Sequence, residues 1–147
     1  MSPLKIVLDT NCLLRSVSRK SAYSVIIDKL YDNAYDLYLT TDILLEYEEK
    51  IAEYFSLETS ELIISSLSLL SNVKKTDIHF RLNLISTDPD DNKFADCAFA
   101  ANVHFLVTED RHYNILKSLS FPKINIITLD EFKTLLTKEE KKNETGA

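Results

Sequence analysis

The segment Asp88–Asp110, DPDDNKFADCAFAANVHFLVTED, gives the clearest indication of the architecture. Its opening predicts the start of a helix, because an N-cap aspartate precedes a proline and further acids in the first turn. This helix is expected to run to about Asn102. The next stretch, His104–Thr108 (HFLVT), is short, apolar and typical of a buried strand. Glu109 and Asp110 follow directly, so the segment predicts a helix and then a buried strand that ends at carboxylates.

The rest of the chain shows the same alternation of strands and helices. Residues 73–85 fit either a short strand or an extended loop, and Thr41 or Asp42 can cap the second helix. Apolar strands that alternate with helices predict an α/β fold with a mostly parallel sheet covered on both faces. The other expected strands are Leu4–Leu8, Asp36–Thr40 and Ile124–Thr128, and the other expected helices are Ser18–Asn33, Thr41–Phe55, Thr59–Asn72, Asp110–Leu119 and Asp130–Leu136.

Length and composition predict one domain. The chain has 147 residues, which is enough for a single core, and 45% of them are hydrophobic. We expect a domain over residues 1–137 and a disordered charged tail, KEEKKNETGA, over 138–147. The first residues lack the features of a signal peptide and no apolar run has the length of a membrane span, so we expect a cytoplasmic protein without membrane contact. Cys12 and Cys97 are expected to be buried, reduced thiols.

The charge balance bears on possible partners. The chain has 17 Lys and Arg residues against 23 Asp and Glu residues, which gives a net charge of −6. Proteins that coat nucleic acid by charge alone are usually basic, so this balance argues against that class. It does not exclude a nuclease, because a metal site gathers acids and its ions reverse the local charge.

Acidic residues follow two of the expected strands. Asp9 comes directly after Leu4–Leu8, and Asp110 comes just after His104–Thr108. Ligands of parallel sheets bind beyond the carboxyl ends of the strands, so two neighbouring strands would bring these acids to one crevice. Carboxylates there can hold Mg²⁺, which positions water and stabilises in-line displacement at phosphorus. The chain carries no Walker, GxGxxG or GxSxG motif, which leaves a cluster of acids as the main candidate site.

Each candidate acid also has a simpler interpretation. Asp9 can cap the turn after its strand, Asp110 can cap a helix, and Asp91 can serve as a first-turn acid. Glu46 can lie on a solvated helix face. Asp96 stands among apolar residues, where an unpaired carboxylate is costly, and this favours a partner for it. The three histidines are not clustered in the sequence and are read as incidental, with His112 the one near the expected site.

At these residues the chain resembles the PIN-domain family, in particular a branch described as toxins of bacterial toxin–antitoxin systems. The resemblance covers roughly Lys5 to Leu136. DTN after a first strand is a weak signal, whereas DPDDNKF followed by VTED and a basic residue is more specific. The matching motifs are VLDTNCLL (Val7–Leu14), LTTDILLEYEEKI (Leu39–Ile51), DPDDNKFADCAFAANVHFLVTEDRHY (Asp88–Tyr113) and INIITLDEF (Ile124–Phe132).

The resemblance implies a fold and a function. It implies a three-layer α/β/α sandwich with a central mostly parallel sheet, and Mg²⁺- or Mn²⁺-dependent cleavage of RNA by a toxin. A cognate antitoxin and a second copy of the chain are the implied protein partners. The implied acidic quartet is Asp9, Glu46, Asp91 and Asp110, with Asp96 as a candidate fifth member.

Other positions of the motifs also have implied roles. Asn11 and Thr108 match polar positions that support Asp9. Glu109 departs from the pattern, since family members commonly carry glycine there, and an added acid could crowd the site. Lys93 and Arg111 are candidate phosphate contacts, and an exposed solvated charge is the alternative for each.

Two other functions are compatible with the sequence. The first is a phosphatase-type or receiver-like α/β enzyme that uses Mg²⁺ and an aspartate nucleophile. Such phosphatases usually carry DxD after the first strand, whereas this chain has DTN. The second is a non-catalytic PIN-like module for binding proteins, against which the complete set of acids argues.

Overall fold

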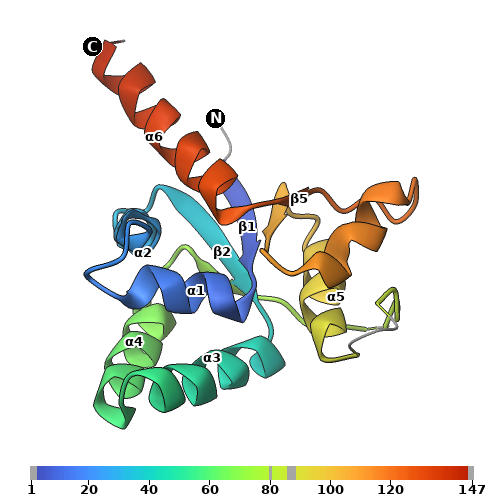
Figure 1. The fold of residues 1–147 in the computed structure, drawn as a ribbon, viewed down its shortest axis with the longest axis horizontal. Coiled ribbons are helices and arrows are strands. Elements are labelled where there is room, and N and C mark those ends of the chain that lie inside the picture. The colour runs from blue at the N-terminus through green and yellow to red at the C-terminus, as the bar shows by residue number, and fades with distance from the viewer. Residues whose placement is uncertain (1–2, 80, 86–88, 146–147) are drawn as a thin grey trace.

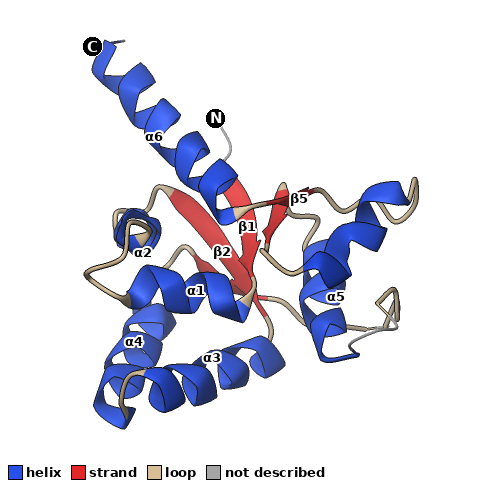
Figure 2. Cartoon of the chain, in the orientation of Figure 1, coloured by secondary structure: helices blue, strands red, loops and turns tan. Residues whose placement is uncertain are grey.

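The computed structural model describes residues 3–79, 81–85 and 89–145 (Figure 1). Helices pack on both faces of a central sheet (Figure 2). The α/β sandwich expected from the sequence is therefore confirmed. In chain order the elements are β1 (Leu4–Leu8), α1 (Thr10–Val17), α2 (Ser24–Tyr31), β2 (Tyr35–Leu39), α3 (Thr41–Tyr54), α4 (Leu57–Leu69), β3 (Val73–Lys75), the 3₁₀ helix η1 (Pro89–Asp91), α5 (Asn92–Ala100), β4 (Phe105–Val107), the 3₁₀ helix η2 (Arg111–Ser118), β5 (Ile126–Ile127) and α6 (Leu129–Thr145).

The sheet has five strands in the order β3-β2-β1-β4-β5, and each neighbouring pair is parallel. β1 lies at the centre, where Ile6 is in register with Leu37 of β2 and with Phe105 of β4. Four of its five residues are apolar, and Ile6 and Val7 are β-branched, as expected for a strand that is covered on both faces. The order places the carboxyl ends of β1 and β4 side by side.

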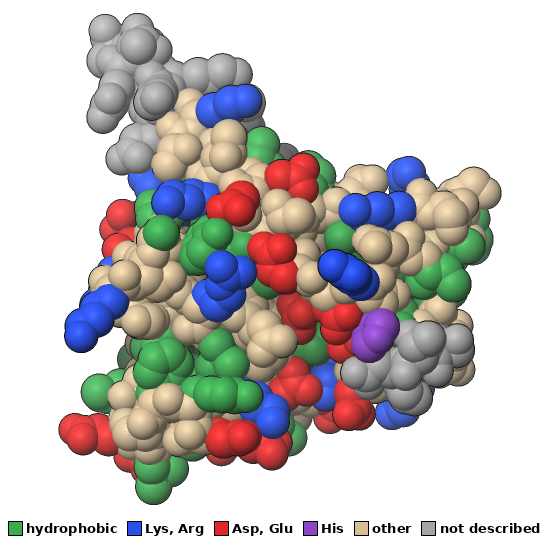
Figure 3. All heavy atoms as spheres, viewed as in Figure 1, with side chains coloured by type: hydrophobic (Ala, Val, Ile, Leu, Met, Phe, Trp, Pro, Cys, Tyr) green, Lys and Arg blue, Asp and Glu red, His purple; other side chains and the backbone are tan. Residues whose placement is uncertain are grey.

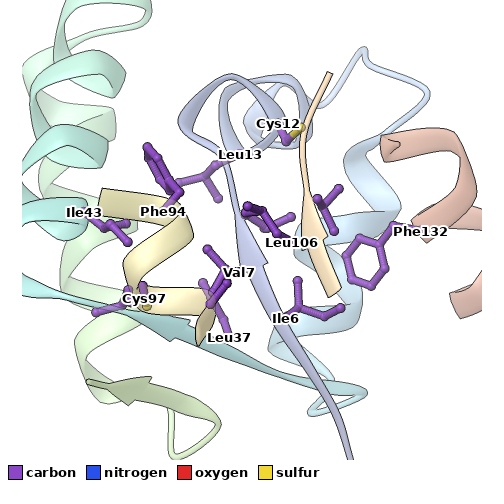
Figure 4. Packing of buried hydrophobic residues seen from close by; sticks show 14 of the residues in the cluster. Ile6, Val7, Cys12, Leu13, Leu37, Ile43, Phe94, Cys97, Leu106 and Phe132 are labelled. Atoms are coloured by element: carbon purple, nitrogen blue, oxygen red, sulfur yellow. The ribbon is translucent and has the colours of Figure 1, made fainter. Parts of the chain in front are cut away.

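Different helices cover the two faces of the sheet. α5 contacts β1, β2 and β4 on one face, and α2 contacts β2 and α6 on the other. Figure 4 shows Phe94 and Cys97 of α5 on one side of β1 and Phe132 of α6 on the other. Tyr35 of β2 ties the second face together, because its hydroxyl donates to the Ile26 carbonyl at 2.9 Å and its ring meets Phe132 edge-on at 5.0 Å.

The first helical region differs from the expectation of one helix over Ser18–Asn33. The structure has α1 directly after Asp9, a break over residues 18–23, and then α2. In the break, Arg19 makes a bidentate pair with Asp28 of α2 at 2.9 Å. An eight-residue helix offers only about two turns of periodicity, so its apolar positions gave too short a pattern to recognise.

Several helix ends also differ from the expectation. The side chain of Thr40, rather than Thr41 or Asp42, caps α3 by accepting from the Ile43 N–H at 3.2 Å. Ser56 caps α4 in the same way. α6 continues to Thr145, whereas the sequence predicted its end at Leu136. The domain boundary at residue 137 and the disorder of the tail remain predictions. The expected cap at Asp88 lies outside the described residues.

The two cysteines are free and buried, as expected. No helix among the described residues has both the length and the apolar character needed to cross a membrane.

Candidate metal centre

The ends of β1 and β4 bring two of the predicted acids together. The backbone N–H of Asp9 donates to the Val107 carbonyl at 3.0 Å, which continues the pairing of the two strands. The Thr108 hydroxyl donates to Asp9 Oδ2 at 2.8 Å and accepts from the Asp110 N–H at 3.0 Å. Thr108 therefore supports Asp9 as predicted and also fixes the turn that carries Asp110. Asn11, the other predicted support, is exposed.

The carboxylate of Asp9 is held in an unfavourable electrostatic environment. Asp9 is only 6% exposed, and it makes no side-chain capping bond to α1, which argues against the simple capping role. Burial raises the pKa of Asp9 to about 6. Hydrogen bonds from Thr108 and the Thr10 amide lower this pKa, while the charges of Asp110 and Glu46 raise it further. A bound cation would relieve both the burial cost and the repulsion.

Asp91 joins the group from the opposite side of the crevice. It ends η1 and lies at the N-terminus of α5, where its side chain makes no capping bond. The Tyr113 hydroxyl, which is buried, donates to the Asp91 carbonyl at 3.0 Å. Burial raises the pKa of Tyr113, and the charges of Asp9, Asp91 and Asp110 raise it further. Tyr113 thus lies within electrostatic range of all three carboxylates.

His112 contacts two of these acids. Its Nδ1 lies 3.3 Å from Asp91 Oδ2 and 3.3 Å from Asp110 Oδ1. Asp91, Asp110 and His112 form a three-residue group, in which one ligand atom of each residue lies within 4.8 Å of the others. The sequence indicated this histidine only as incidental and near the expected site, and the structure places it in contact with both acids. Asp110 does serve as the cap of η2, because its Oδ1 accepts from the His112 N–H at 2.9 Å, and it takes part in this group as well.

Glu46 reaches the group from α3. The Thr10 hydroxyl donates to its Oε2, and the Lys93 Nζ lies 2.8 Å from its Oε1. Its charge contributes to the raised pKa of Asp9, which places it within electrostatic range of that residue. The side chain is 22% exposed, so Glu46 does not lie on a fully solvated helix face. Lys93 is itself paired rather than free in solvent.

Asp96 lies apart from the three-residue group. Its carboxylate is buried and accepts from the Leu82 N–H at 3.0 Å. Burial raises the pKa of Asp96, and the Leu82 amide and the charge of Arg81 lower it. Four residues earlier, the Asn92 amide pairs with both backbone groups of Ile85 at 2.8 and 2.9 Å. Together these bonds hold residues 82–85 against the start of α5.

The departure at Glu109 does not crowd the acids. Its carboxylate accepts from the Leu129 N–H at 3.0 Å and lies 3.8 Å from Arg15, so it turns toward α6 and α1. The neighbouring Arg111 is exposed.

The donor set fits a divalent cation. Figure 3 shows acidic side chains gathered near the middle of one face, with basic side chains and a histidine beside them. Carboxylate oxygens are the ligands that Mg²⁺ and Mn²⁺ accept, and one or two of them with water complete such sites. Asp9, Asp91 and Asp110 would hold the ion, directly or through water. Glu46 would then lie at the border of the site.

A cleft of about 880 Å³ opens beside Glu46. α3 as far as Lys50 and the start of α5 form two of its walls, and residues 76–79, 81 and 83 contribute to another. Basic side chains line it beside the acids. These are Lys50, His79, Arg81 and Lys93. Acidic side chains line the same cleft in larger number, so its lining is mixed in charge; they are Asp42, Glu46, Glu49, Asp77, Asp90 and Asp96.

Sequence reasoning missed Thr10 and Tyr113, and it did not indicate the contacts of His112. Thr10 is the residue after Asp9 and belongs to the quoted DTN motif, so its position was a usable signal. The contacts of Tyr113 and His112 with Asp91 span 22 and 21 residues, and no local pattern indicates them.

Comparison with known proteins supports this architecture. A family model described as a PIN domain matches residues 5–112. Similar solved structures are VapBC2 from Rickettsia felis bound to a promoter DNA fragment (TM-score 0.56, 16% identity, covering 85% of this chain and 98% of that chain), DNA-bound VapBC from Salmonella typhimurium (0.53, 15%, 86% and 98%) and VapC20 from Mycobacterium tuberculosis, a sarcin–ricin loop cleaving toxin (0.54, 9%, 81% and 98%). No curated protein matches the chain.

The fold is that of a PIN-like α/β sandwich. The family match covers well over half of the sequence, and the chain therefore belongs to the PIN-domain family. The structural similarities, all at low identity, show that it has the VapC type of fold.

Proposed function

We propose that this protein is a metal-dependent endoribonuclease that hydrolyses RNA phosphodiester bonds. The observation that carries the proposal is the group of Asp91, Asp110 and His112, whose ligand atoms lie within 4.8 Å of one another. Asp9 lies beside this group, because Thr108 hydrogen-bonds both its carboxylate and the Asp110 N–H. Such a gathering of acids is electrostatically unfavourable by itself, as the raised pKa of Asp9 indicates. Perturbed carboxylates in a cleft are typical of functional sites.

The residues divide into holding and positioning roles. Asp9, Asp91 and Asp110 would hold Mg²⁺ or Mn²⁺, which when bound supplies Lewis acidity, lowers the pKa of water and offsets charge on the phosphate. Glu46, at the border of the group, is placed to orient the attacking water or to hold a second ion. Thr108 keeps Asp9 in position through its hydroxyl.

Asp96 has a different place in the proposal. The sequence predicted it as a member of the metal and catalytic set, and its bond to Leu82 supports a positioning role for the cleft wall. The role of the wall would be to guide the RNA strand past Glu46. Lys93 and Arg81 line this cleft and are the proposed phosphate contacts, since each brings a positive charge to it.

The biological role that we propose is that of a toxin in a toxin–antitoxin pair, acting in the cytoplasm. Two of the similar solved structures are VapBC complexes bound to DNA, and another similar protein is described as a toxin that cleaves the sarcin–ricin loop. These are properties of those proteins, and they support the expectation of a cognate antitoxin for this one.

Exposed apolar side chains on α4 support protein partners, either an antitoxin or a second copy of the chain. Leu57 and Leu62 are each about two-thirds exposed, and Leu69 is 86% exposed. Apolar surface of this kind commonly marks contact sites. By contrast, the apolar residues of α2, such as Ile26 and Leu30, are buried and cover the sheet.

Calorimetry with Mn²⁺ tests the proposal without knowledge of the substrate. The wild type should bind Mn²⁺ at up to millimolar concentration, and Asp9→Asn should lose the binding. Asp28→Asn is the matched control, because Asp28 pairs with Arg19 away from the group. No binding by the wild type would favour the non-catalytic module.

Product analysis then separates the remaining alternatives. Hydrolysis by water leaves no 2′,3′-cyclic phosphate on RNA, whereas attack by the 2′-hydroxyl does. RNA cleaved only with metal, and without cyclic ends, is the expected result. A trapped aspartyl-phosphate analogue would instead favour the phosphatase-type enzyme.

A further inference from the structure

His112 places a nitrogen donor beside the proposed metal ligands. Its Nδ1 is 3.3 Å from an oxygen of Asp91 and 3.3 Å from an oxygen of Asp110. The imidazole side chain is 45% exposed, whereas Asp91 is 13% exposed, so the ring lies at the mouth of the crevice above a more buried carboxylate. The same nitrogen therefore faces both acids from the solvent side.

The separations fit neighbouring ligands of one ion. Two donors at about 2.1 Å from a metal, in adjacent positions of an octahedron, are about 3 Å apart. The two nitrogen–oxygen distances of 3.3 Å are close to this value. Donor atoms of all three residues also fall within 4.8 Å of one another, which leaves room for an ion between them.

The backbone fixes this arrangement. The His112 N–H donates to Asp110 Oδ1 at 2.9 Å, and Asp110 thereby caps the turn that carries the imidazole. The Tyr113 hydroxyl, one residue further, donates to the Asp91 carbonyl and holds the opposite side of the crevice. The nitrogen is thus positioned by two bonds that join consecutive residues of η2 to the two acids.

We propose that His112 is a ligand of the metal, which makes the centre a mixed nitrogen–oxygen site that prefers Mn²⁺ to Mg²⁺. This inference rests on the proposed metal-dependent function. Mg²⁺ is a hard ion that strongly favours oxygen donors, whereas imidazole is a good ligand for first-row transition ions. A nitrogen at the mouth of the crevice therefore shifts the preference toward Mn²⁺.

The competing explanation is an ion pair in which a protonated His112 only balances the charges of Asp91 and Asp110. Both roles use Nδ1, so the distances alone are compatible with either. They differ in whether the nitrogen is bonded to the ion, and pulsed electron paramagnetic resonance of bound Mn²⁺ detects a directly bonded nitrogen through its ¹⁴N coupling.

The experiment compares the Mn²⁺-loaded wild type with His112→Ala and His79→Ala. His79 is an exposed histidine outside the three-residue group and serves as the matched control. We expect ¹⁴N coupling in the wild type and in His79→Ala, and none in His112→Ala. Loss of a residue that only hydrogen-bonds a metal ligand lowers metal affinity about 10- to 100-fold, so loss of a direct ligand should weaken Mn²⁺ binding at least about tenfold. The affinity for Mg²⁺ should change much less.

The possible failures are distinguishable. Mn²⁺ that binds the wild type without ¹⁴N coupling would overturn the ligand role of His112 and leave the nuclease proposal standing. Absence of any Mn²⁺ binding by the wild type would overturn both. Because the coupling is measured on the unmodified chain, a His112→Ala variant that fails to fold does not prevent the decision.

Discussion

Replacement of Asp9 by asparagine should stabilise the metal-free protein near neutral pH. The pKa of Asp9 is raised from 3.8 to about 6 in the folded chain, because the carboxylate is buried and faces other acids. A folded-state pKa above the unfolded value means that the protonated form favours folding. The stability from this group is therefore complete below about pH 4 and is lost as the pH rises through about 6.

The size of the effect follows from the shift. One pKa unit corresponds to about 1.4 kcal/mol, so ionised Asp9 lowers the free energy of unfolding by about 3 kcal/mol at neutral pH. Asparagine keeps an oxygen that can accept from Thr108 but carries no charge. For a domain of this size, the gain corresponds to a rise in Tm of roughly 6–12 °C.

Urea unfolding at about pH 7.5 and about pH 4, without metal, measures this difference. We expect Asp9→Asn to exceed the wild type at the higher pH and to match it at the lower one. Asp28→Asn should change in the opposite sense, since the Arg19 guanidinium lowers the pKa of Asp28. Equal stability of Asp9→Asn and wild type at about pH 7.5, or a gap that persists at about pH 4, would refute the reasoning.

Excess Mn²⁺ should reduce the difference in stability between Asp9→Asn and the wild type at neutral pH. An ion that binds only the folded wild type adds about 2.7 kcal/mol to its stability at a concentration of 100 Kd. The Asp9→Asn variant should gain little, because it lacks a proposed ligand. If both proteins gain equally, the ion binds elsewhere and Asp9 is not part of the site.

Three other substitutions test the supports of the site. Tyr47→Phe removes the buried hydroxyl that donates to the Leu8 carbonyl at 2.5 Å, and it should cost about 1–3 kcal/mol in thermal or urea unfolding. Asn92→Ala should release the backbone of Ile85 and speed amide hydrogen exchange over residues 82–85, with metal affinity little changed. Unchanged exchange would show that the Asn92 side chain does not hold this segment. Glu109→Gln should leave Mn²⁺ affinity within about twofold in calorimetry, because the carboxylate faces away from the acids.

The elements that the sequence predicted well carry local signals. Leu4–Leu8 is a compact apolar run, and it forms β1 with those bounds. The α3 helix was recognised over nearly its full length because its apolar positions recur over several turns. By contrast, the eight-residue α1 lies directly after β1, with no polar loop between them to mark its start.

The residues of the candidate site also divide into those with a local sequence signal and those without one. Asp9 and Asp110 were paired in advance because each follows a strand, and the parallel neighbours β1 and β4 bring them together. His112 could not be recognised, because its contact with Asp91 depends on how η2 folds back onto α5. The bond from Asp96 to the Leu82 amide depends equally on the path of a loop. The roles of the site residues remain predictions, which Mn²⁺ binding by the wild type and the variants tests.

The bonds that orient Asp9 explain why the site can remain negative. They come from the Thr108 hydroxyl and the Thr10 amide, which are neutral donors. A cation in either place would have fixed the carboxylate equally well, but it would have lowered its pKa and cancelled the charge that attracts a metal. Asp91 is held differently, because the Tyr113 hydroxyl donates to its backbone carbonyl while its carboxylate lies 3.3 Å from His112 Nδ1. Lys93 pairs with Glu46 rather than with these aspartates. Its charge there can offset that of Glu46 and contact a phosphate. Neutral donors at Asp9 and a cation on Glu46 are therefore the arrangement that the proposed site for a divalent ion and a phosphate would require.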